Sequence, residues 1–151
     1  MNIFTTNICP IISAQEMCDK HVVKMIVEYA QLMSTAHRVL DGDEYYAKTK
    51  IGRRIKRWLH PDKYKEELLY KASHIKHPSG IWCRTSTANY DWLYNHFKAS
   101  CKEYTRRYGR EHLTETKMSA VLSKPPKNLP RGKQTEFAVA IAPEQKCRQA
   151  P

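Results

Sequence analysis

Polar side chains of different chemistry recur along one face of the strongest predicted helix. Apolar residues at helical spacing, followed by Asp41-Gly42 as a stop, predict that this helix runs from about Ala14 to Leu40. At steps of three and four residues, its polar face carries His21, Lys24, Glu28, Gln31, Thr35 and Arg38. A face that only meets solvent usually repeats Glu and Lys, so this mixture favours a catalytic or phosphate-contacting stripe. The alternative is an exposed face with one Lys24–Glu28 pair.

Glu28 is the carboxylate that we single out in this stripe. It lies among basic residues, where a negative charge would stabilise a cationic intermediate or transfer a proton. His21 is a candidate for positioning or proton transfer. Asp19 and Glu16 are rival carboxylates, but both lie near the helix start, where a carboxylate also interacts with the helix dipole.

A second cluster lies in residues 77–97, where aromatic residues alternate with basic and polar ones. Aromatic rings can stack on bases, while Arg and Asn contact phosphates or base edges. We therefore predict nucleic-acid contacts for His77, Arg84 and Asn89. Trp82 and Trp92 are better explained as core residues.

The charge balance points to a polyanionic partner. The 151 residues carry 26 Lys and Arg against 15 Asp and Glu, a net charge of +11, and nucleic acid is the commonest polyanion. The alternative is a protein that is basic without a specific partner. Six positive charges and no acid fall between Lys48 and Arg57, and from these we predict phosphate contacts for Arg53, Arg54 and Arg57.

Several classes of protein are disfavoured. The chain has no P-loop, dinucleotide-binding, zinc-protease or serine-hydrolase motif, and no apolar run long enough to span a membrane. Five cysteines without framework spacing indicate free thiols in a reducing cytosol. Cys18 and His21 are spaced like zinc ligands, but nothing completes a set of four. We expect no metal, no cofactor and no membrane association.

The remaining elements predict a mainly α fold in a single compact domain, residues 1–151, with a loop-rich C-terminal third. A second long helix fits Asn89–Tyr108, capped by Ser86 or Thr87 and ended by Gly109. A short helix is expected in Lys63–Ser73 and a turn at His77–Gly80. An ordered, proline-rich surface loop follows Leu122, and Thr135–Ala142 is expected to be a strand or a buried helical turn.

Two family resemblances follow from these motifs. CDKHVVKMIVEYAQLMSTAHRVLDG and HPSGIWCRTSTANYDWL resemble a family of small phage-encoded proteins, which implies a phage origin and the cytosol of a host cell. More distantly, Asp19-Lys20-His21 and Glu28 keep the spacing of the endonuclease V type of pyrimidine-dimer DNA glycosylase. A His-Pro turn, a break at Arg107–Gly109, a Leu-Pro loop and an Ala/Ile-rich segment at Ala138–Ala142 follow in the family's order.

The second resemblance implies an all-α enzyme that flips a base, or its partner, out of duplex DNA. It further implies that the N-terminal amine, here that of Met1, attacks the sugar C1′ to form an imine, with Glu28 assisting sugar opening and elimination. The chain departs from the family in three places. Asn2 disfavours removal of Met1, Val27 and Ile3 stand where the family has Arg, and the C-terminus lacks an aromatic, basic tail, as in a truncated or altered chain.

On this reading, Lys24 and Arg38 take the place of the missing arginines, and the protein is a monomeric DNA N-glycosylase and abasic-site lyase. Two alternatives stay open. The chain could be a noncatalytic phage module that binds nucleic acid or a host protein, or an enzyme that acts on a free nucleotide.

Overall fold

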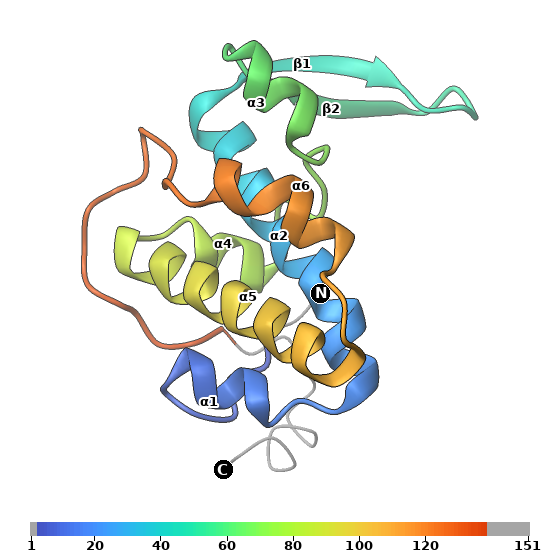
Figure 1. Cartoon of the computed structure of the whole chain (residues 1–151). Helices are drawn as coiled ribbons and strands as arrows, with labels where there is room; N and C mark the ends of the chain where they lie inside the picture. Colours follow the sequence, from blue (N-terminus) through green and yellow to red (C-terminus); the bar gives the residue numbers. More distant parts are fainter. Residues whose placement is uncertain (1–2, 139–151) are drawn as a thin grey trace.

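Two long helices, α2 (Asp19–Asp41) and α5 (Thr87–Tyr108), form the centre of the molecule. The computed structural model describes residues 3–138. Around the central pair lie α1 (Pro10–Gln15), α3 (Lys63–Leu68), α4 (Pro78–Cys83) and α6 (Leu113–Leu122), while β1 (Asp43–Lys48) pairs with β2 (Arg54–Leu59) (Figure 1). The prediction of a mainly α, single-domain fold is confirmed.

The core forms where α2 meets α4, α5 and α6. Ile26, Tyr29 and Met33 on α2 are fully buried, as are Tyr90 and Phe97 on α5. Their helical spacing turns one face of each long helix inward, and removing this apolar surface from water drives the helices together.

The second long helix has the ends that the sequence predicts. Ser86 caps its start, because its Oγ accepts the Asn89 N–H at 3.2 Å. Gly109 ends it in the left-handed conformation, with φ 71°.

The expected start of the first long helix, by contrast, is wrong. The chain breaks between α1 and α2 at residues 16–18. Arg107 on α5 bridges the break, since it donates to the Gln15 carbonyl at 3.1 Å and to the Asp19 carboxylate at 3.0 Å. A side chain that is distant in sequence therefore fixes the end of α1 and the start of α2. The local periodicity predicts these two helices as one.

Residues 43–59 form an antiparallel hairpin, and no strand is predicted for these residues from the sequence. Asp43 pairs with Leu59 and Lys48 with Arg54, and Gly52 closes the loop with φ 79°. Both faces of the ribbon carry charged or exposed residues. The alternation of apolar and polar positions that indicates a half-buried strand is therefore absent from these residues.

Three shorter segments also differ from expectation. The helix predicted for Lys63–Ser73 ends at Leu68, and the chain then continues without helical structure. The turn predicted at His77–Gly80 is the beginning of α4, with His77 as its N-cap. Of Thr135–Ala142, residues 135–138 form no strand or helix, and 139–142 lie outside the described residues.

The four cysteines within the described residues, Cys9, Cys18, Cys83 and Cys101, are free thiols, as expected. Cys147 lies outside this part of the chain. None of the helices between residues 3 and 138 combines the length and the apolar character that a bilayer crossing demands.

Arg38 fastens the segment after α3 to α2. Its buried guanidinium donates to the carbonyls of Leu69 at 2.8 Å, Tyr70 at 2.7 Å and Trp58 at 2.9 Å. It also pairs with the Glu66 carboxylate. One side chain thus joins α2, β2, α3 and the strand-like segment that follows α3.

Replacing Arg38 with Ala should lower the free energy of unfolding by about 3 kcal/mol, because the half-buried Glu66 carboxylate and several carbonyls lose their donor. Lys20→Ala, on an exposed position of the same helix, should change it by less than about 0.5 kcal/mol. Urea denaturation followed by circular dichroism measures both. Equal stability of the two variants would show that the Arg38 network is dispensable.

Candidate functional site

The polar stripe of α2 divides into an accessible half and a covered half. Lys24 is exposed and His21 and Glu28 are half-buried, whereas Thr35 and Arg38 are only 2% and 4% exposed. Gln31 lies between, half-buried. The covered half binds the chain segment that crosses it, and Arg38 also borders a hollow of about 540 Å³ beside the hairpin.

This crossing segment runs antiparallel to α2. Arg38 contacts Tyr70, and one helical turn earlier the Thr35 hydroxyl accepts the Ser73 N–H at 3.2 Å. The same path brings His77 near Glu28, whose negative charge acts to raise the pKa of the His77 ring. The covered half of the stripe therefore positions residues at the accessible half.

His77 has a second role as the N-cap of α4. Its Nδ1 accepts the Ser79 N–H at 3.1 Å, so Nε2 is the nitrogen left for other partners. Burial, with the nearby His74 ring, lowers the pKa of His77 despite the opposing effect of Glu28. A neutral imidazole can accept or relay a proton.

Arg84 holds its guanidinium near the same segment, with no carboxylate partner among residues 3–138. Nη2 donates to the Ile75 carbonyl at 2.5 Å, while Nη1 is buried and has no hydrogen-bond partner among residues 3–138. Burial lowers the pKa of Arg84, although the group remains a cation. The half-buried guanidinium places a cationic charge beside the segment around Ile75.

The beginning of the described chain is fixed against α2 and α5. The Phe4 ring stacks on His21, with centroids 4.3 Å apart, and the Phe4 N–H donates to the Tyr29 hydroxyl at 3.2 Å. That hydroxyl lies 3.0 Å from His96 Nε2, and His96 Nδ1 lies 2.8 Å from the Pro10 carbonyl. This network holds the N-terminal segment at both Phe4 and Pro10.

The proton positions in this network follow from its ends. A carbonyl can only accept, so His96 Nδ1 carries the proton and Nε2 accepts from Tyr29. Tyr29 in turn accepts from the Phe4 N–H. Burial lowers the pKa of His96 to about 4, which agrees with a neutral ring in this position.

Glu28 lies on α2 directly before Tyr29 and two turns after His21, beside this fixed segment. Its side chain is half-buried, and Oε2 is shielded from solvent. A carboxylate in such a place keeps its charge close to any substrate atom that enters, with little competition from water. The arrangement can stabilise a cation or transfer a proton.

The other predicted binding residues fall into separate regions. Asn89 is fully buried and bonds to the Trp82 carbonyl and to Thr135, so it fastens residue 135 to α5. Arg53, Arg54 and Arg57 lie on the hairpin. Met1 lies outside the described residues. Lys24, His21 and Glu28 thus share α2, while His77 lies near enough to Glu28 to feel its charge and Arg84 bonds to Ile75 in the same crossing segment.

Four further residues shape this site without appearing in the sequence prediction: Phe4, Tyr29, His74 and His96. His74 adopts φ 49°, a left-handed conformation that is uncommon for residues other than Gly. Tyr29 and His96 fall on apolar helix faces, where a polar atom with a partner distant in sequence gives no periodic signal. One signal in the sequence could have indicated His74: it lies three residues before His77, with Ile75 and Lys76 between the two histidines.

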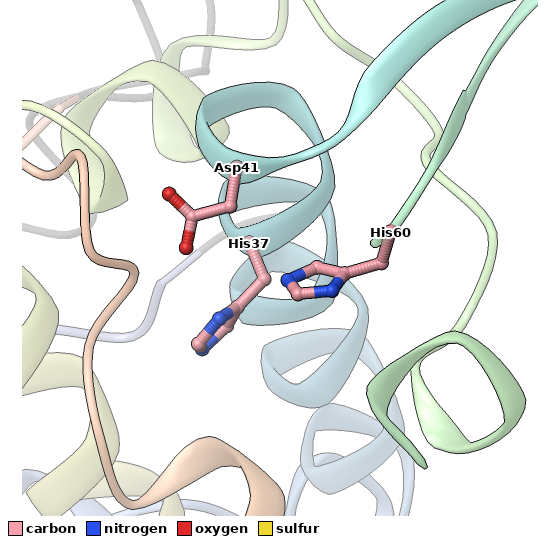
Figure 2. A group of neighbouring side chains, drawn as sticks. All are labelled: His37, Asp41 and His60. Atoms are coloured by element: carbon pink, nitrogen blue, oxygen red, sulfur yellow. The ribbon is translucent and has the colours of Figure 1, made fainter. Parts of the chain in front are cut away.

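A separate buried cluster joins the end of α2 to the hairpin. One ligand atom each from His37, Asp41 and His60 lie within 4.8 Å of one another (Figure 2). Because Tyr90 donates to the Leu122 carbonyl, His37 Nε2–H must donate to Tyr90, which leaves a lone pair on His37 Nδ1.

His60 has the opposite proton arrangement. Its Nδ1 accepts the Asp62 N–H at 3.1 Å, so the proton of the neutral ring is on Nε2. His37 Nδ1 and His60 Nε2 are both buried without a hydrogen-bond partner among residues 3–138. With these proton positions the neutral rings offer one lone pair and one N–H, rather than two lone pairs for a cation. Asp41 already accepts from the backbone of Lys127 and Asn128. We interpret the cluster as a structural link.

Comparison with known protein families gives one match. The model of the family described as pyrimidine dimer DNA glycosylase matches residues 1–116. This range includes Glu28, His77 and Arg84 and ends within α6. Searches of curated proteins and of solved structures give no match.

The neutral state of His96 makes stability depend on pH. The unfolded ring binds a proton below about pH 6.5 and the native ring only near pH 4, so the free energy of unfolding should fall as pH drops through this window. One such group contributes at most about 1.4 kcal/mol per pH unit. Urea denaturation of His96→Gln should show a shallower pH dependence than the unaltered protein. Parallel pH profiles would contradict the assignment.

Proposed function

Because this chain belongs to the pyrimidine dimer DNA glycosylase family, we propose that it removes damaged or modified pyrimidine bases from duplex DNA and then cleaves the strand at the abasic sugar. The match covers Glu28 on α2 as well as His77 and Arg84, the residues that flank α4. The net charge of +11 suits a polyanionic substrate.

In the proposed mechanism, the Met1 amine is the nucleophile. Its free base attacks C1′ of the target nucleotide, the C1′–N bond breaks, and the base leaves with a proton. The C1′–O4′ bond then breaks with protonation of O4′, which opens the sugar and gives an iminium ion. This ion loses a proton from C2′ and expels the 3′ phosphate. An α-amine has a reference pKa near ~8, and nearby positive charge would lower it toward neutrality.

Glu28 would stabilise the cationic sugar and transfer the protons of ring opening and elimination. The observation that carries this proposal is the attachment of Phe4 to Tyr29 and His21, one residue and two turns from Glu28. Only two residues precede Ile3, and an extended residue spans at most about 3.6 Å. A Met1 amine would therefore be within reach of the part of α2 that carries the carboxylate.

Substrate phosphates would bind to Lys24, Arg84 and the His77 Nε2. Arg84 is included for its half-buried cationic charge. Arg38 and Asn89 are left out of this set, because their donors are occupied within the protein. We further propose that the protein acts as a monomer in the cytoplasm of a phage-infected host cell.

Glu28→Gln should reduce the rate of strand cleavage at least about 100-fold, because the amide can neither transfer a proton nor stabilise a cation as a carboxylate does. Single-turnover cleavage of ultraviolet-irradiated duplex measures the rate, and a filter-binding assay measures affinity, which should stay within about threefold. Glu111→Gln, whose carboxylate bonds only Thr116 in the described contacts, serves as the matched control. Loss of cleavage and binding together would indicate a structural role for Glu28.

Blocking the N-terminal amine should abolish cleavage while leaving duplex binding intact. Reductive methylation converts the primary amine to a tertiary one, which cannot form an imine, yet it preserves the positive charge. The conversion is restricted to the N-terminus by working near pH 6.5, where lysines are largely protonated. Full activity of the methylated protein would exclude the Met1 amine. Tight binding without cleavage by either form would favour a noncatalytic nucleic-acid-binding module.

A further inference from the structure

The hairpin of β1 and β2 projects from the helical body as an arm (Figure 1). Each strand has six residues, which corresponds to about 20 Å of extended chain. The arm is anchored at its base, where Trp58 is buried and Arg57 donates to the Ala72 carbonyl at 2.8 Å. Beyond this base, its residues are exposed or half-buried.

Positive charge is concentrated toward the tip of the arm. Residues 45–61 contain no Asp or Glu. Within them, the exposed basic residues are Lys48, Lys50, Arg53, Arg54 and Lys56. The single acidic contact lies nearer the base, where Glu44 pairs with Lys56 at 3.1 Å. The positive charges of such a ribbon repel one another, and a polyanion that lies beside the ribbon stabilises it.

The two faces of the arm differ. On one face, the Arg54 guanidinium lies 3.7 Å from the centroid of the Tyr46 ring, which orders a cation on an exposed aromatic surface. The other face borders a hollow of about 540 Å³, opposite Glu67 and Lys71. Neither face is covered along its length by the helical body. An isolated two-stranded hairpin is marginally stable in water, so core packing does not explain the length of this arm.

The tip combines basic and apolar side chains. Ile51 is 87% exposed and lies between Lys50 and the Gly52-Arg53 pair, in a loop closed by the Thr49–Arg53 hydrogen bond at 2.8 Å. The major groove of B-DNA is about 12 Å wide, which admits a two-stranded ribbon, and thymine methyl groups form apolar spots on its floor.

We propose that this arm lies in the major groove of the duplex, with its lysines and arginines on the flanking phosphates and Ile51 against the groove floor. The inference takes DNA as the partner from the proposed function, but it adds a second contact, outside the base-excision site and independent of damage. It predicts that the arm contributes to affinity for any duplex, whether or not a lesion is present.

The test compares the salt dependence of binding to an undamaged 30-base-pair duplex. Lys50→Ala/Arg53→Ala should reduce the slope of log K against log [salt] by about 1.8, because about 0.9 is lost for each phosphate contact removed. The matched control, Lys102→Ala/Lys117→Ala, removes two exposed charges from α5 and α6 and should leave the slope unchanged. An arm variant with the slope of the unaltered protein would overturn the proposal.

Ile51→Ser tests the groove contact separately. It should weaken duplex binding several-fold without changing the salt slope, since no charge is removed, and binding to a single strand should be unaffected. Unchanged duplex affinity, or an equal loss on the single strand, would overturn the placement of Ile51.

Cleavage of irradiated duplex by the same variants separates the two proposals. Cleavage with an unchanged salt slope in the Lys50/Arg53 variant would overturn the arm inference and leave the glycosylase proposal standing. A reduced slope in a protein that never cleaves would support the arm and contradict the glycosylase.

Discussion

The attachment of residues 69–77 to α2 is the constraint on which the rest of the site depends. A buried guanidinium, that of Arg38, satisfies the carbonyls of this segment, and Thr35 continues the contact one turn earlier. Backbone groups of an extended segment need such partners when they lie against a helix rather than in a sheet. The same segment then delivers His74, Ile75 and His77 to the region of Glu28 and Arg84.

A second set of contacts holds the start of the chain. The hydrogen bonds from Phe4 through Tyr29 and His96 to Pro10 have a defined direction only while His96 is neutral. Burial of that ring among aromatic residues keeps it neutral. The proposed chemistry therefore relies on two buried polar networks. One holds residues 69–77 and the other holds the start of the chain, and α2 carries residues of both.

The sequence is informative where structure is local. Periodicity predicts the two long helices, and the residues at the ends of α5 predict its cap and its stop, because these signals lie within one or two turns. The stripe on α2 is recognised as unusual, but its covered half is assigned to phosphates instead of to the segment around Ser73. Burial of Arg38 depends on residues 20 to 32 positions away, which no spacing rule reveals. The hairpin is not predicted for a related reason. A ribbon that is exposed on both faces has no alternation of apolar and polar residues.

Borohydride trapping on irradiated duplex tests the central claim most directly. If the Met1 amine forms an imine, a covalent protein–DNA adduct should appear on irradiated but not on undamaged duplex. Mass spectrometry of the digested adduct should locate the sugar on the Met1 amine. An adduct on a lysine side chain would contradict the assigned nucleophile. Cleavage of irradiated duplex without any trapped adduct would contradict imine chemistry and indicate a glycosylase that uses water.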